Sequence, residues 1–131
     1  MRQKAIIYLV DDDPSALRGL TRLLLAAGYE LNAYASSDEL LKNPITDKNT
    51  CLVLDARMPG LSGMSLKAKL DKMGIKIPVI FVTADDDDET RKKARALKAV
   101  GFFRKPVDGP ALLDAVSWAL ETQEGDSGHT V

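Results

Sequence analysis

The sequence predicts an α/β domain in which a parallel β-sheet is covered by helices on both faces. Short apolar runs rich in β-branched residues alternate with helical patterns along the chain, as in successive βαβ units. The strand-like runs are apolar almost throughout, which is typical of strands buried on both faces. With 131 residues, 45% of them hydrophobic, the chain is long enough for one compact domain and too short for two.

The expected elements follow one another strictly, strand before helix. The predicted strands are residues 5–10, 30–34, 51–54, 78–82 and 99–103. The predicted helices are residues 14–27, about 37–41, 65–73, 87–98 and 109–121. Four prolines fall at the edges of these elements or in loops: Pro44, Pro59, Pro78 and Pro106.

Three of the helices have specific signals. The first has Asp13 as an N-cap before Pro14, ends at Gly28 and has one apolar face, formed by Leu17, Leu20, Leu24 and Ala27. The fourth begins with an acidic run and continues with basic residues, which suits the helix dipole and favours a solvated helix. The fifth has a buried stripe of Leu112, Val116, Ala119 and Leu120, with Trp118 on its polar side.

Composition excludes several functions. The 18 Lys and Arg residues against 19 Asp and Glu give a net charge of −1, which disfavours direct binding to nucleic acid or to an anionic membrane. No apolar run is long enough to span a membrane, and the run at 5–10 is too short for a signal peptide. The single cysteine, Cys51, and the single histidine, His129, exclude an internal disulfide and a Cys- and His-based zinc site. We therefore expect a reducing, cytoplasmic setting.

The last ten residues, 122–131, are small and polar and include Gly125 and Gly128. This composition favours a flexible tail or the start of a linker to an output domain that is absent here. The predicted domain therefore spans residues 1–121.

Polar side chains follow four of the predicted strands. Asp11, Asp12 and Asp13 follow the first strand, Asp55 the third, Thr83 ends the fourth, and Lys105 comes after the fifth. In an open parallel sheet, ligands bind beyond the carboxyl ends of the strands, so these groups are expected at one edge.

Carboxylates gathered at this edge would repel one another. Each pair about 4 Å apart costs roughly 4 kcal/mol at an effective dielectric of about 20, so the group takes up protons or holds a cation. An all-oxygen donor set favours Mg²⁺, or Mn²⁺. An acidic turn that caps the next helix is the alternative for Asp11–Asp13 alone.

A metal beside a carboxylate, a hydroxyl and an ammonium is suited to phosphoryl transfer onto an aspartate. Asp55 is the best candidate nucleophile because it stands alone, whereas Asp11 and Asp12 are better placed as metal ligands. Thr83 would donate a hydrogen bond, and Lys105 would neutralise charge on the phosphoryl oxygens.

The chain resembles the receiver domain of two-component response regulators over residues 4–121. The resemblance rests on the sequences Val10-Asp11-Asp12-Asp13, Leu54-Asp55-Ala56-Arg57-Met58-Pro59-Gly60, Val82-Thr83-Ala84 and Lys105-Pro106. The segment from Arg57 to Gly63 is most like receivers of the FixJ type, which precede a LuxR-type helix-turn-helix domain. The resemblance implies a CheY-like, flavodoxin-like doubly wound (βα)5 fold with five parallel strands in the order 2-1-3-4-5.

The resemblance also implies a role for each motif residue. Asp55 would accept a phosphoryl group from a sensor histidine kinase. Asp12, Asp55 and the backbone carbonyl of Arg57 would bind Mg²⁺ directly, with Asp11 assisting through water. Thr83 and Lys105 match the switch hydroxyl and the phosphate-binding lysine, and Phe102 the switch aromatic. A cis peptide is implied between Lys105 and Pro106.

Phosphorylation in this family repacks the surface made by the elements at 87–98, 99–103 and 109–121, which controls dimerisation or an output domain. The protein would be a signalling domain that turns over its own phosphate and not a metabolic enzyme. We hypothesise that Arg57 and Asp85, if they pair, screen the phosphate and slow its hydrolysis; two solvated side chains are the alternative.

Three other functions share parts of this pattern. A haloacid-dehalogenase-like phosphatase needs a second acid two residues after its nucleophile, where this chain has Arg57. A flavodoxin-like cofactor carrier needs a phosphate loop after the first strand, where Asp11–Asp13 would repel a phosphate. A pseudo-receiver that acts as a constitutive interaction module is the third, although all the phosphorylation residues are present.

Overall fold

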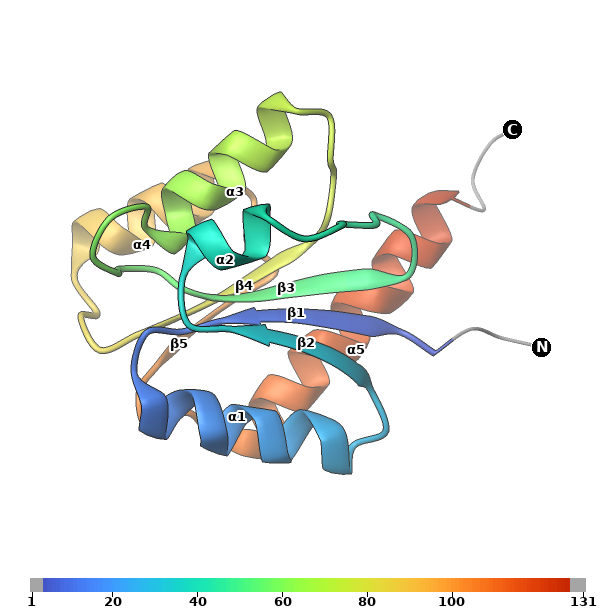
Figure 1. The fold of residues 1–131 in the computed structure, drawn as a ribbon, viewed down its shortest axis with the longest axis horizontal. Helices are drawn as coiled ribbons and strands as arrows, with labels where there is room; N and C mark the ends of the chain where they lie inside the picture. The colour runs from blue at the N-terminus through green and yellow to red at the C-terminus, as the bar shows by residue number, and fades with distance from the viewer. Residues whose placement is uncertain (1–3, 128–131) are drawn as a thin grey trace.

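The structure is a computed structural model that describes residues 4–127. Five parallel strands form one sheet in the order β2-β1-β3-β4-β5, which confirms the predicted fold (Figure 1). The strands are β1 (Ile6–Val10), β2 (Glu30–Tyr34), β3 (Thr50–Asp55), β4 (Val79–Thr83) and β5 (Gly101–Arg104).

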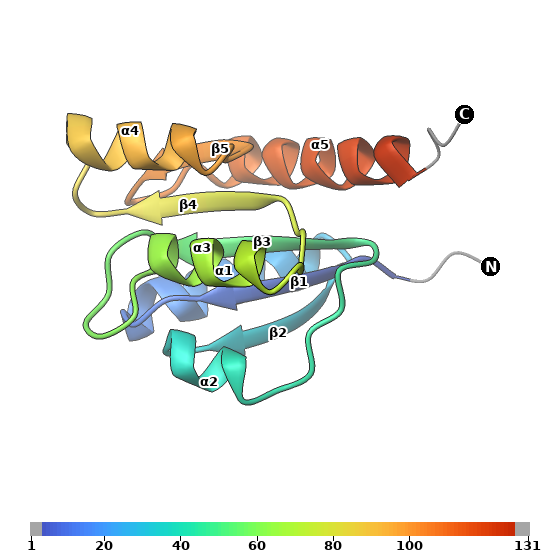
Figure 2. The same cartoon turned by 90° about the horizontal axis from the view of Figure 1, so that it is seen from above.

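Helices cover both faces of the sheet. They are α1 (Pro14–Ala26), α2 (Ser37–Leu41), α3 (Gly63–Lys72), α4 (Asp88–Ala96) and α5 (Gly109–Ser127). Figures 1 and 2 show α1 and α5 on one face and α2, α3 and α4 on the other. This two-sided cover follows from the strict alternation of strand and helix, because a parallel crossover must pass over one face of the sheet.

The sheet separates two apolar cores. Alternate residues of β1, β3 and β4 point to opposite faces, so each of these strands contributes to both cores. On the α1 and α5 face, the helices contribute Leu20, Leu24, Leu112, Val116 and Ala119. On the other face, they contribute Leu40, Leu66, Leu70 and Ala94.

The predicted stripes are largely correct. In α1, Leu20 and Leu24 are buried, but Ala27 is exposed because it is the C-cap, beyond the last helical residue. In α5, Trp118 is 62% exposed, as its place on the polar side predicted.

Most boundaries match the prediction to within one residue, and the larger differences are in α3, α4, β5 and α5. Helix α3 begins at Gly63, two residues earlier than predicted, because the Ser62 side chain accepts a hydrogen bond from the Ser65 N–H and caps it. Helix α4 ends at Ala96 and not at residue 98. Strand β5 begins at Gly101 and not at residue 99. Helix α5 continues to Ser127, beyond the predicted end at residue 121.

The longer α5 brings Gln123 against the opposite end of the sheet from the candidate site. Its Oε1 accepts a hydrogen bond from the Thr50 N–H at 2.9 Å, and its Nε2 donates to the Asp47 carbonyl at 2.6 Å. These contacts lie inside the segment predicted as a tail or linker. The rest of that segment, residues 128–131 with Gly128 and His129, lies outside the described residues.

Candidate functional site

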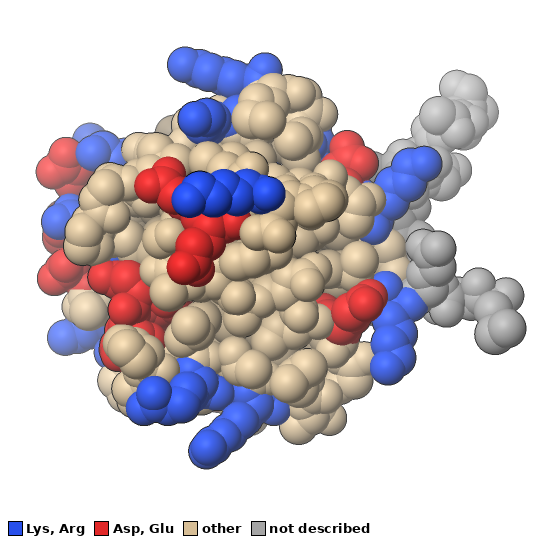
Figure 3. Space-filling view, in the orientation of Figure 1, with Lys and Arg blue, Asp and Glu red and all other residues tan. Residues whose placement is uncertain are grey.

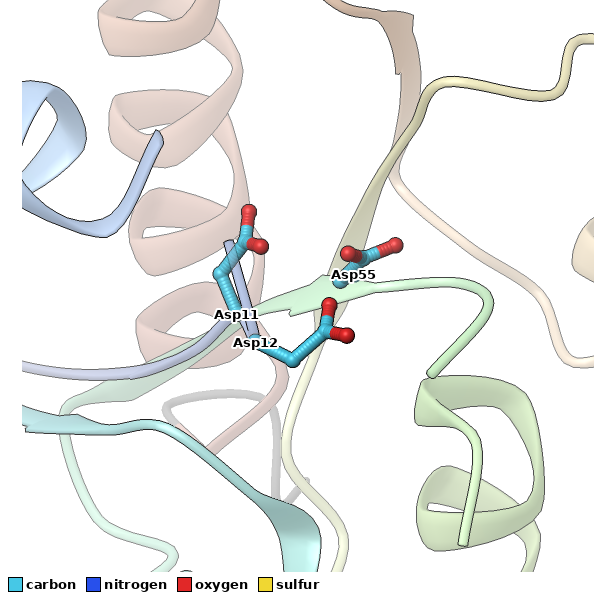
Figure 4. Close-up of side chains that lie close together, drawn as sticks. All are labelled: Asp11, Asp12 and Asp55. Atoms are coloured by element: carbon cyan, nitrogen blue, oxygen red, sulfur yellow. The ribbon is translucent and has the colours of Figure 1, made fainter. Parts of the chain in front are cut away.

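Three carboxylates meet at the carboxyl ends of the two central strands. In the β1 and β3 pairing, Val10 lies opposite Leu54, so the residues that follow them lie side by side: Asp11, just beyond β1, and Asp55, the last residue of β3. One carboxylate oxygen from each of Asp11, Asp12 and Asp55 lies within 4.8 Å of the others. Figure 4 shows these side chains grouped at the ends of β1 and β3. Asp11 and Asp55 are buried and Asp12 is exposed, so the cluster is open on one side.

Lys105 brings a positive charge from the loop after β5. Its Nζ lies 3.0 Å from Asp11 Oδ1 and 3.1 Å from Asp55 Oδ2 and donates a hydrogen bond to each. The Lys105 N–H donates to the Thr83 carbonyl at 2.8 Å, which fixes this loop against the end of β4. The peptide bond between Lys105 and Pro106 is cis, as the resemblance implied.

Burial and like charge change the acidity of Asp55. Burial and the neighbouring Asp11 charge raise the pKa of Asp55 to about 7, although the Lys105 ammonium and the Arg57 N–H act in the opposite direction. Burial works against the charged form of Lys105, but hydrogen bonds to Asp11 and Asp55 hold the pKa of Lys105 above its ordinary value. The carboxylates of the cluster therefore repel one another when ionised, and a bound cation would reduce this repulsion.

The donor set fits a hard divalent cation. Asp11 Oδ2 is buried and has no hydrogen-bond partner of acceptable geometry, although the Lys105 Nζ lies 2.9 Å from it. The cluster holds three carboxylates, of which Asp11 and Asp55 contact the Lys105 ammonium. All the available ligands are oxygens, the type that Mg²⁺ and Mn²⁺ prefer. This chemistry agrees with the Mg²⁺ site expected from the sequence.

The two residues expected to act as a switch lie on neighbouring strands. Thr83 is fully buried at the end of β4, where its hydroxyl accepts a hydrogen bond from the Asp85 N–H at 3.0 Å. Phe102 is half-buried on β5, and the Arg91 guanidinium of α4 lies 5.3 Å from the centre of its ring. The side chain of Arg91 is held by an ion pair with Asp86.

Arg57 lies in the loop after β3 and pairs with Asp87, so the hypothesis that required it to pair with Asp85 fails. Its Nη2 lies 2.9 Å from Asp87 Oδ2, and its Nε and Nη2 donate to the Thr90 hydroxyl at 3.2 and 2.9 Å. Asp87 takes this place because it is the N-cap of α4 and stands next to the first helical turn. Hydrogen bonds from Thr90 and the nearby Arg57 charge lower the pKa of Asp87.

Gly63 sets how closely α3 approaches the acceptor strand. A Cβ atom at this position would lie 2.1 Å from the Asp55 carbonyl oxygen, so any side chain forces the helix or the strand to move. This role of Gly63 was not predicted from the sequence, and neither was the position of Asp87, Thr90 and Arg91 next to the site. The spacing from Asp87 to Thr90, an N-cap followed three residues later by the residue it caps, was the available signal.

The surface carries both signs of charge. Figure 3 shows Lys and Arg side chains spread over the visible face, with acidic side chains gathered toward the left, where the strands end in Figure 1. Among residues 4–127, no helix is both long enough and apolar enough to cross a membrane.

A family model describes most of the chain. Residues 7–117 match the model of the response regulator receiver domain. Nodulation protein W of Bradyrhizobium diazoefficiens is 42% identical over 90% of this chain and 52% of its own length. The transcriptional regulatory protein FixJ of Azorhizobium caulinodans is 31% identical over 92% of this chain and 57% of its own length.

Solved structures agree with these relatives. The response regulator StyR superimposes with a TM-score of 0.87 and 35% identity over 96% of this chain and 64% of its own. The amino-terminal part of FixJ superimposes with a TM-score of 0.81 and 29% identity over 92% of this chain. The chain spans about half the length of the curated relatives it matches. The fold, the acidic edge and these likenesses lead to one conclusion: the chain belongs to the receiver domains of two-component response regulators.

Proposed function

We propose that the domain accepts a phosphoryl group on Asp55 from a phosphohistidine of a sensor histidine kinase. The observation that carries the proposal is the position of Asp55, a buried carboxylate at the end of the central strand that is hydrogen-bonded to Lys105 and grouped with Asp11 and Asp12. An isolated carboxylate exposed on the surface would have none of this support.

In the proposed step, a carboxylate oxygen of Asp55 attacks phosphorus, and the phosphorus–nitrogen bond of the donor breaks. The electron pair of that bond returns to the imidazole of the donor, which takes up a proton. The Lys105 ammonium already lies 3.1 Å from Asp55 Oδ2, so it is placed to neutralise a phosphoryl oxygen. The Arg57 N–H, 3.2 Å from Asp55 Oδ1, holds the second carboxylate oxygen in position.

Mg²⁺, with Mn²⁺ as a substitute, is the proposed cofactor. Asp12, Asp55 and the Arg57 carbonyl would hold the ion, with Asp11 assisting through water. When bound, the ion supplies charge that neutralises the transferred group. Two observations support this assignment. Asp11 Oδ2 is buried without a hydrogen-bond partner, and the pKa of Asp55 is raised.

The output is proposed to be a change in a protein-binding surface. Thr83 would move toward the phosphoryl oxygens and Phe102 would follow it inward, which repacks the surface formed by α4, β5 and α5. The half-buried position of Phe102 and the exposed Trp118 on α5 support this surface as the one that changes. Dimerisation through it, or control of an output domain of the kind that the longer relatives suggest, would be the consequence.

The domain is therefore proposed to be regulatory, with self-catalysed phosphoryl transfer and slow loss of its own phosphate. We propose the cytoplasm as its location because a sensor kinase would meet it there. No direct contact with nucleic acid or membrane is proposed for this chain. Residues 122–131 would join it to an output domain that regulates transcription.

The test is intact mass after incubation with acetyl phosphate and Mg²⁺. Wild type is expected to gain the mass of one phosphoryl group only when Mg²⁺ is present, and Asp55→Asn is expected to gain none. Asp85→Asn is the matched control, because it makes the same chemical change at an exposed aspartate on the nearby loop. Size-exclusion chromatography of the same samples reports dimerisation.

An unlabelled wild type, under conditions that label a known receiver, would contradict the proposal. The domain would then be a constitutive interaction module, and the three aspartates would form a structural metal site. Labelling of Asp55→Asn at the wild-type level would show that another side chain is the acceptor.

A further inference from the structure

Arg57 connects the candidate acceptor to α4. Its backbone N–H donates to Asp55 Oδ1 at 3.2 Å, while its side chain crosses to the amino end of α4. There the guanidinium contacts Asp87 Oδ2 at 2.9 Å and the Thr90 hydroxyl at 2.9 and 3.2 Å. One residue thus touches both the carboxylate and the helix whose surface is proposed to change.

The Thr90 hydroxyl gives this contact its geometry. The Arg57 and Asp87 side chains are 46% and 49% exposed, so their ion pair alone contributes at most about 1 kcal/mol. Thr90 is fully buried, and two guanidinium N–H groups donate to its oxygen. A buried acceptor with a fixed position holds the flexible arginine side chain in one orientation.

Apolar packing adds little at this end of α4. Of the nine residues in the helix, Thr90 and Ala94 are the buried ones, and neither is large. A second polar contact at this end is the ion pair of Asp86 and Arg91, whose guanidinium lies over the Phe102 ring. The position of the first turn therefore depends on polar groups that a change of charge can redirect.

A phosphoryl group on Asp55 would compete for the Arg57 side chain. It carries a charge of about −1.5 to −2 and offers oxygens that a guanidinium binds in a bidentate manner. Asp87 offers one negative charge that is half exposed to solvent. Since Arg57 is anchored to Asp55 through its own backbone, the exchange requires only rotation of the side chain.

We propose that Arg57 is a positioning residue that transmits the phosphorylation state of Asp55 to α4. In the unphosphorylated domain it holds the first turn of α4 through Asp87 and Thr90. On phosphorylation it exchanges these partners for phosphoryl oxygens and releases that turn. This inference rests on the proposed function, because it requires Asp55 to be the acceptor.

Hydrogen exchange at the start of α4 tests the inference. The contact with Arg57 is removed by substituting its two partners on α4, so Arg57 itself is left unchanged. The variant combines Asp87→Ser, which keeps an N-cap side chain, with Thr90→Val, which keeps the buried volume without the hydroxyl. Exchange in peptides covering residues 84–92 is followed by mass spectrometry, with and without Mg²⁺ and beryllofluoride as the phosphoryl analogue. Lys93→Ala is the control, because it removes an exposed ion pair with Glu89 on the same helix.

In wild type and in Lys93→Ala, beryllofluoride is expected to raise exchange of the first turn of α4 about fivefold, the ratio that corresponds to about 1 kcal/mol of lost hydrogen bonding. In the double variant, exchange is expected to be raised already without the analogue, and beryllofluoride is expected to change it by less than about twofold. A response to beryllofluoride in the double variant as large as in wild type would overturn the inference. Resting exchange equal to that of wild type would also overturn it.

Intact mass with acetyl phosphate separates the two possible failures. If wild type forms no adduct, the proposed function itself fails. If wild type and the double variant both form the adduct and α4 responds equally in both, only the role of Arg57 fails.

Discussion

Helices α3 and α4 lie on the same face of the sheet and have almost equal length, yet they are held in different ways. Helix α3 puts Leu66 and Leu70 fully into the core and rests Gly63 against the backbone of Asp55. Helix α4 buries only Thr90 and Ala94 and depends on polar side chains from its neighbours. Helix α3 is therefore held mainly by apolar packing, whereas α4 is held mainly by polar contacts.

This difference explains how one domain can keep a rigid site and still change its surface. Apolar packing responds little to a charge added at Asp55, because it has no electrostatic component to redirect. The contacts of α4 with Arg57 are electrostatic and respond directly to that charge. We therefore expect substitutions on α3 to lower stability and substitutions on α4 to alter the response to phosphorylation.

The largest effect is expected for Gly63→Ala. A Cβ atom 2.1 Å from the Asp55 carbonyl oxygen forces backbone to move, which should lower the free energy of unfolding by about 4 kcal/mol in urea titrations. Gly19→Ala in α1 is the matched control. Nothing lies within 4 Å of its added Cβ, and alanine should stabilise that helix by about 0.5–1 kcal/mol. Equal changes in the free energy of unfolding for the two variants would show that close packing at Gly63 does not fix α3.

The second largest loss of stability is expected for Leu66→Ala. Leu66 is fully buried in α3, and its truncation leaves a cavity that costs about 3 kcal/mol, measured by the same titration. Met73→Ala, just beyond the end of α3, serves as its control because Met73 is 55% exposed. A loss below about 1 kcal/mol for Leu66→Ala would show that α3 is not fixed by its core contacts.

The next effect in size is expected for pH: the difference in the free energy of unfolding between wild type and Asp55→Asn should change with pH. Because the pKa of Asp55 is raised from 3.8 to about 7, the folded protein binds more protons than the unfolded chain between these values. Wild type should therefore lose stability relative to Asp55→Asn, by roughly 2 kcal/mol, as pH rises through this range without Mg²⁺. Thermal unfolding at a series of pH values measures the difference, and a flat difference would contradict the raised pKa.

Addition of Mg²⁺ sharpens the same experiment. An ion that binds the ionised cluster stabilises the folded state only, so it should raise the melting temperature of wild type more than that of Asp55→Asn. Equal shifts in the two proteins would place the ion elsewhere.

The smallest effect is expected on α4. Thr90→Val removes the hydroxyl that binds Arg57 but keeps an apolar group of similar shape, so the free energy of unfolding should fall by about 1 kcal/mol or less. Lys93→Ala should change it by less than about 0.5 kcal/mol, since the pair with Glu89 is exposed. A loss at Thr90 as large as that at Leu66 would mean that α4 is fixed as firmly as α3.

Most of the fold could be predicted from the sequence because each helix and strand has a local sequence signal. All five strands and five helices were predicted, and the strand order came from the family resemblance. The errors lie where tertiary contacts set the boundary. Gly63 begins α3 early because it can approach the Asp55 carbonyl, and α5 continues past residue 121, where Gln123 reaches Thr50 and Asp47.

The candidate site was predictable to the level of residues but not of side-chain partners. The parallel sheet brings Asp11, Asp12, Asp55 and Lys105 together, because the order of strands alone decides which ends meet. The partner of Arg57 depends on the path of the loop through four consecutive aspartates, of which Asp86 turns to Arg91 and Asp87 to Arg57. Sequence spacing does not distinguish these aspartates, so it could not show that Asp87, and not Asp85, is the partner of Arg57.

The burial of Cys51 has a practical consequence for experiments on this domain. Its side chain is fully buried in β3, and burial raises the pKa of its thiol to about 12, so maleimide reagents should leave it unmodified while the protein is folded. A cysteine placed at an exposed position such as Lys93 would then be the single site to take a fluorophore, with no need to remove the native thiol. A single dye on α4 could then report changes of that helix by fluorescence.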